Sequence, residues 1–133
     1  MIPNTATSGS DALAQVLQHL NHEGKFSISI LTDEQGLAIA SASENGFDPD
    51  RQAAVAALVQ RAIGQAGSRL GMAQIDEMIF YTTENERLVC RFFNAQGHSL
   101  ILAVTIIGKE QTYRRLMKQT ITQVREVWAK YWE

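Results

Sequence analysis

Residues 98–107 have the sequence HSLILAVTII. From Leu100 to Ile107 nearly every side chain is apolar, so both faces that alternate along a strand are hydrophobic. A strand of this kind lies inside a sheet that is covered on both sides, and not at a solvated edge. The segment therefore predicts a central strand, with helices above and below the sheet.

Four further segments have the alternation or composition of strands. KFSISILT (25–32) and LAIASAS (37–43) flank the turn formers DEQG, which is typical of a hairpin. Downstream, the turns at 84–85 and 94–97 are so short that the strands they join must be antiparallel. The predicted strands are residues 25–32, 37–43, 74–83, 86–93 and 98–107.

Three helices complete the order α-β-β-α-β-β-β-α. Ser10 is the predicted N-cap of the first, and Asp48 followed by proline has the same role for the second. The predicted helices are residues 11–22, 49–70 and 110–131. The pattern predicts one α/β (α+β) domain over residues 10–133, preceded by a flexible tail of residues 1–9.

The second helix has an unusual face. Its stretch RQAAVAALVQRAIGQAG (51–67) contains two charged residues, and the side turned away from the apolar stripe is small and nearly uncharged. Glycine inside an exposed helix costs about 1 kcal/mol relative to alanine, and close approach of another backbone offsets that cost. A simpler explanation is that alanine is a good helix former and that the glycines end the helix early.

The third predicted strand gives a second reason to expect self-association. Met78, Ile79, Phe80 and Tyr81 form an unbroken apolar run on a strand that follows a crossover and should lie at a sheet edge. Pairing with a second copy would cover both surfaces. The predicted dimer interface contains Ala53, Ala57, Gln60, Gly64, Gly67, Met78 and Phe80. Beside this seam, a polar partner-binding rim is predicted at Arg51, Gln52 and Arg61.

Composition excludes several classes of protein. The 133 residues are 45% hydrophobic and carry a net charge of −2, which gives no global attraction for nucleic acid. A single cysteine allows no internal disulfide and suits a reducing compartment. We expect a cytoplasmic protein without membrane insertion, because no stretch resembles a signal peptide or a membrane span.

Few residues have a pattern that indicates chemistry. His19 and His22 have a spacing that can share a metal ion, but no further ligand follows nearby, and solvated histidines are the simpler interpretation. Cys90 lies on an apolar strand and is expected to be a small buried side chain. The sequence has no phosphate-binding loop of the GxxxxGK[ST] type. We predict no catalytic residue, no cofactor and no metal site.

One basic cluster follows the last strand. Lys109, Arg114, Arg115 and Lys118 lie close together in the sequence, and a solvated helix face is the simplest interpretation. The alternative is a docking patch for an acidic partner or a membrane surface.

With these elements in place, the chain resembles the Roadblock/dynein light-chain domain family over residues 10–131. The resemblance rests on the hairpin SISILTDEQGLAIAS, the alanine-rich helix and the strand LILAVTII. It implies a five-stranded antiparallel sheet of order 2-1-5-4-3, with helix 2 on one face and helices 1 and 3 on the other. It also implies pairing through helix 2 and strand 3, and a role as a non-catalytic homodimeric scaffold or regulator of a Ras-like small GTPase.

A small-molecule-sensing module of the PAS or GAF type is the alternative. It also wraps helices around an antiparallel sheet, but it needs a cavity with a few converging polar groups. The apolar residues on both faces of the central strands argue against such a cavity.

Overall fold

The computed structural model describes residues 8–43, 75–108 and 112–132, together with Asp48, Asp50, Ala54, Ala57, Arg61 and Gly71. Its elements are α1 (Gly9–Gly24), β1 (Ile28–Asp33), β2 (Ala38–Ser43), β3 (Glu77–Tyr81), β4 (Glu86–Ala95), β5 (His98–Ile107) and α3 (Arg114–Tyr131).

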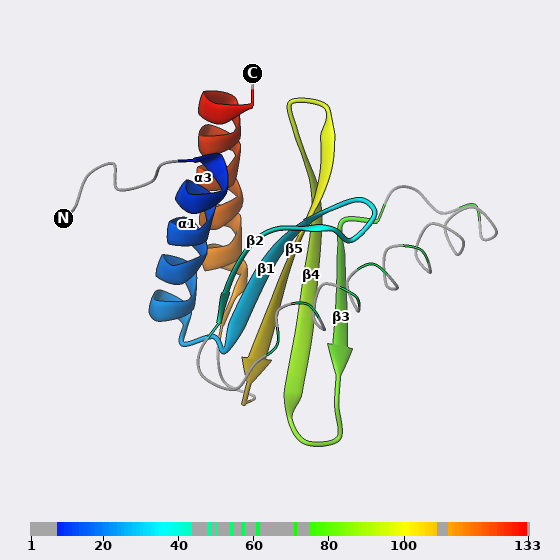
Figure 1. Cartoon of the computed structure of the whole chain (residues 1–133). Helices are drawn as coiled ribbons and strands as arrows, with labels where there is room; N and C mark the ends of the chain where they lie inside the picture. Colours follow the sequence, from blue (N-terminus) through cyan, green and yellow to red (C-terminus); the bar gives the residue numbers. More distant parts are fainter. Residues whose placement is uncertain are drawn as a thin grey trace.

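The five strands form one antiparallel sheet of order β2-β1-β5-β4-β3 (Figure 1). β5 is central, since Val104 pairs with Ser29 of β1 on one side and with Val89 of β4 on the other. The predicted fold class and strand order are therefore confirmed.

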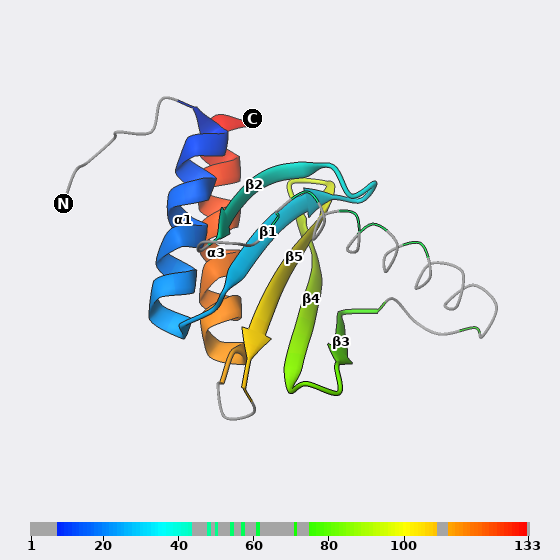
Figure 2. The same cartoon turned by 60° about the horizontal axis from the view of Figure 1, so that its bottom comes forward.

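α1 and α3 lie side by side on one face of the sheet, which we call the helical face (Figures 1 and 2). They pack on alternate residues of β5, such as Leu102 and Val104. Two hydrogen bonds fix α1 to the first hairpin: Asn21 Nδ2 donates to the carbonyl of Ala42, and Ser29 Oγ donates to the carbonyl of Leu17. No described helix is long and apolar enough to cross a membrane.

The opposite face of the sheet, which we call the second face, is also buried. Its core includes Ile28, Ile30, Cys90, Ile101 and Ala103. β5 is therefore buried from both sides, as its continuous apolar run predicts.

Part of the predicted second helix is described. Asp48 Oδ1 accepts a hydrogen bond from the backbone N–H of Asp50, which is the contact of an N-cap, and Asp50 is already helical. Ala54, Ala57 and Arg61 are helical as well. The other residues of this prediction lie outside the described part of the chain, as do residues 1–7.

The start of α1 corrects one prediction. Ser8, and not Ser10, is the N-cap, because its side chain accepts from the backbone N–H of Asp11 at 3.1 Å. Gly9 is the first helical residue and is buried, and a Cβ there would overlap the indole ring of Trp132. Ser8 and Gly9 therefore belong to the folded domain and not to the tail.

Candidate interaction surfaces

The outer strand of the sheet, β3, exposes large apolar side chains. Among the described strands β3 pairs with β4 alone, so none of these strands pairs with its other edge. Phe80 is 42% exposed and Tyr81 is 73% exposed. Met78 and Phe80 lie on the second face, because their partners across β4 are Cys90 and Leu88. An unpaired apolar edge is a liability in water unless another chain covers it.

Ala57 is buried within its own chain. It is 9% exposed and lies against Gly36 in the β1–β2 turn, where a Cβ on Gly36 would overlap Cβ of Ala57. Helical spacing placed Ala57 on the outward side of the second helix, but the turn already covers its methyl group. Asp33 shapes this turn, because its Oδ1 accepts from the backbone N–H groups of Gln35 and Leu37.

Arg61 is exposed, as a partner-binding side chain must be. The remaining predicted interface and rim positions lie outside the described residues, so the structure does not place them. They are Arg51, Gln52, Ala53, Gln60, Gly64 and Gly67.

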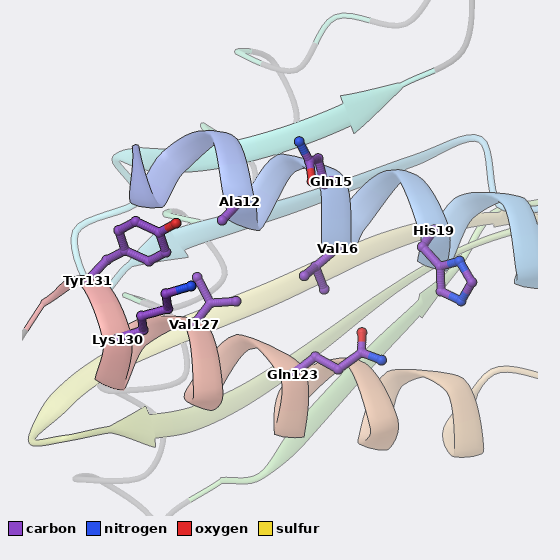
Figure 3. Close-up of a pocket in the computed structure, with 8 residues that line it drawn as sticks. All are labelled: Ala12, Gln15, Val16, His19, Gln123, Val127, Lys130 and Tyr131. Atoms are coloured by element: carbon purple, nitrogen blue, oxygen red, sulfur yellow. The ribbon is translucent and has the colours of Figure 1, made fainter. Parts of the chain in front are cut away.

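A groove of about 470 Å³ separates the solvent-facing sides of α1 and α3 (Figure 3). Val16 and Val127 form its apolar part, and His19 and Lys130 stand at its margins. His19 Nε2 is 3.8 Å from the carboxylate of Glu23 in the next turn of α1, and both side chains are well exposed. This geometry is that of a solvated helical pair and not of an enclosed ligand site.

A second groove, of about 600 Å³, lies between α3 and β4 on the helical face. Lys118, from the predicted basic cluster, lines it together with Arg91 and Arg125. Sequence reasoning missed these two arginines. For Arg91 the sequence did hold a clue. Arg91 shares its strand face with the apolar residues Val89 and Phe93, and a charged residue on an otherwise apolar strand face is unusual.

Cys90, which the sequence predicts to be a small buried side chain, and His98 lie on opposite faces of the sheet. Cys90 is fully buried on the second face, and burial raises the pKa of its thiol from 9.0 to about 12. His98 lies on the helical face, where its ring is 5.4 Å from that of Trp128. Among the described residues, no group of three or more His, Cys, Asp and Glu side chains could hold a metal ion.

The layer between the sheet and the described helices is filled by apolar side chains. Leu13, Leu17, Leu102 and Val124 are fully buried there. A small-molecule sensor would need converging polar groups in such a layer.

No profile of a known protein family matches the sequence, and no curated protein matches it. Solved structures do match. MglB of Myxococcus xanthus has 16% identity and a TM-score of 0.69, covering 98% of this chain and 91% of that chain. The gliding protein MglB from Thermus thermophilus has 18% identity and a TM-score of 0.66, with 98% and 96% covered. A Roadblock/LC7 domain from Streptomyces avermitilis has 21% identity and a TM-score of 0.65, with 88% and 95% covered. At these identities the likeness establishes a shared fold.

Proposed function

We propose, from the premise that this chain has the Roadblock fold, that it is a non-catalytic homodimeric scaffold. Its partner would be a Ras-like small GTPase, which it binds and regulates in the cytoplasm. The partner class comes from the resemblance to the Roadblock family, whose members associate with such GTPases.

The observation that carries the proposal is the apolar edge of β3. Phe80 and Tyr81 are exposed on an outer strand, and Phe80 lies on the second face beside a buried apolar cluster. A copy related by a two-fold axis would pair edge to edge and continue the sheet. Met78, Phe80 and the small residues of the second helix would then form the seam.

The GTPase would bind where the dimer brings its two second helices together. Arg51, Gln52 and Arg61 would be presented twice around this seam. A single GTPase cannot match a two-fold surface symmetrically, so we expect one GTPase per dimer, bound asymmetrically. Affinity should be modest, on the order of micromolar, and should fall with added salt if the arginines contribute.

Two measurements test the proposal. Sedimentation at micromolar concentration should give a dimer of the 14.8 kDa chain, and a species of monomer mass alone would contradict it. The Ras-like GTPases encoded in the same genome should then be purified, loaded with GDP or with a non-hydrolysable GTP analogue, and titrated with the protein. We expect nucleotide-dependent binding to at least one of them. If none binds in either state, the GTPase part is wrong, whatever the oligomeric state.

A further inference from the structure

The groove between α3 and β4 concentrates positive charge in a protein whose net charge is −2. Arg114, Lys118 and Arg125 fall at i, i+4 and i+11 of α3, and this spacing puts them on one stripe of the helix. Arg91 supplies a cation from the strand side. Both sides of the groove therefore carry cations.

Contacts at each end show that α3 and β4 run alongside one another. At one end, Arg87 of β4 donates to the carbonyl of Gly108, and its guanidinium is 5.7 Å from the ring of Tyr113, next to the start of α3. At the other end, Nε of Arg125 donates to the carbonyl of Asn94 at 2.9 Å. From Arg114 to Arg125 the helix rises about 17 Å at 1.5 Å per residue, so the basic surface is elongated.

Acidic side chains offset only part of this charge. Glu77 is 3.7 Å from the guanidinium of Arg114, and Asp76 lines the same groove. Nε of Arg91 is buried and has no hydrogen-bond partner among the described residues. A buried charged donor without an acceptor is costly, so Arg91 keeps unmet hydrogen-bonding capacity beside the groove.

Apolar groups lie between the cations. Phe93 and Ile121 line the groove, and the guanidinium of Arg125 stands 5.6 Å from the centre of the Phe93 ring. Phe93 and Ile121 are only 9% and 5% exposed, so they form the floor of the groove and the cations form its exposed contacts.

We propose that this groove binds an acidic, extended segment of a partner protein. A strand rises about 3.3 Å per residue, so about five or six residues would follow the basic stripe, with their carboxylates on the cations. A single phosphate group would engage only one part of a surface of this length, and Asp76 would repel a dense negative charge.

The location separates this site from the proposed dimer seam. The cations of the groove, Arg91, Lys118 and Arg125, lie on the helical face, whereas Met78 and Phe80 lie on the second face. The scaffold could therefore hold the acidic segment of one protein while its second face is occupied, which is how it would bring two proteins together.

The test titrates the full chain into a fluorescein-labelled peptide of alternating glutamate and leucine. Binding is measured by the fluorescence anisotropy of the peptide. A peptide with lysine in place of glutamate is the ligand control. Lys118→Gln/Arg125→Gln removes two exposed charges from the groove. Arg115→Gln/Lys130→Gln removes the same charge from the same helix, but at positions that line other surfaces.

We expect the wild-type protein to prefer the glutamate peptide and to lose affinity as salt is added. The groove variant should bind about fivefold to tenfold more weakly, and the control variant should differ by less than about twofold. Equal weakening by both variants would show a response to net charge and would overturn the site. Absence of preference for the glutamate peptide would overturn it too. Vesicles containing phosphatidylserine form a separate arm: binding to them in place of the peptide, lost in the groove variant, would replace the proposal with a lipid site.

Discussion

Replacing Gly36 by alanine should destabilise the protein for two separable reasons. Gly36 has φ of +87°, a conformation that costs an L-residue about 1–2 kcal/mol. The added Cβ would also overlap Ala57, and overpacking of this kind costs about 1–3 kcal/mol. The free energy of unfolding should therefore fall by about 2–5 kcal/mol.

Gly97 provides a matched control for the backbone cost. Its φ is +84°, and a Cβ built on it meets no atom within 4 Å. Gly97→Ala should lose only the conformational part, about 1–2 kcal/mol. The difference between the two variants measures the overlap at Gly36.

A double-mutant cycle then tests the contact with Ala57. Ala57→Gly alone should cost about 1–2 kcal/mol through lost burial and helix propensity. Combined with Gly36→Ala it removes the overlap with Cβ of residue 57 but leaves Cα of that residue 2.9 Å from the added Cβ. The double variant should therefore be more stable than the sum of the single effects, by about 1 kcal/mol.

Urea unfolding followed by tryptophan fluorescence supplies these values, at one fixed protomer concentration because dimerisation changes apparent stability. Strict additivity in the cycle, or equal losses for Gly36→Ala and Gly97→Ala, would refute the packing of residue 57 against the turn. Sedimentation of the same variants would then show whether Ala57 instead contacts a second copy.

Four further outcomes are expected. Phe80→Glu should raise the dimer dissociation constant by at least about tenfold, because it places a charge in the proposed seam. The control Leu37→Glu changes an exposed apolar residue on the β1–β2 turn and should leave the dissociation constant unchanged. Equal dissociation constants for the two variants by sedimentation would exclude the β3 edge from the interface. Cys90 should react with a thiol reagent at pH 8 at least about a hundredfold more slowly in the native than in the denatured protein, because its pKa is raised to about 12. The same shift means that the folded thiol holds its proton longer, so stability should fall as pH rises from about 9 toward 12, and Cys90→Ala should flatten that fall. Arg61→Glu should weaken GTPase binding without changing the dimer; wild-type affinity would remove Arg61 from the partner surface, and a broken dimer would place it in the seam.

The sheet could be predicted from sequence because its strands carry strong local signals. β5 was predicted at residues 98–107 and is found there, since turn formers bound an apolar run that must be buried on both faces. β3 was predicted at residues 74–83 but extends only from Glu77 to Tyr81. Thr82 instead closes the hairpin, with its backbone N–H donating to the carbonyl of Glu86 and its Oγ1 accepting from the N–H of Glu84. The hydrophobic periodicity of the sequence gives no information about side-chain hydrogen bonds of this kind.

The β4–β5 turn shows a different limit. Residues 94–97 were predicted as a four-residue turn, but Asn94 and Ala95 continue β4 by pairing with Ser99 and His98. The turn itself contains Gln96 and Gly97, both with positive φ. Glutamine is not a residue that turn rules associate with positive φ, so the two-residue hairpin could not be recognised locally.

The surfaces were harder to predict than the fold. The apolar run of β3 was identified because consecutive hydrophobic residues at a predicted edge are visible in sequence. The basic groove was not, because Lys118 and Arg91 are far apart along the chain and meet only when α3 packs on β4. Ala57 shows a related limit, since helical spacing gives the direction of a side chain but cannot reveal that the β1–β2 turn reaches over it.

The central place of β5 also has a consequence during protein synthesis. β1 and β2 are the first strands to leave the ribosome, after α1. β5, which pairs with the other side of β1, begins roughly 65 residues after β1 ends, and synthesis of that length takes several seconds at about 5–20 residues per second. Throughout that interval the nascent hairpin has an unpaired inner edge that carries Ile28, Ile30 and Leu31, all of them fully buried in the finished protein. Such an edge is open to pairing with neighbouring nascent chains, so the yield of folded protein should depend on the speed of translation and on the chaperones that shield the hairpin until β5 arrives.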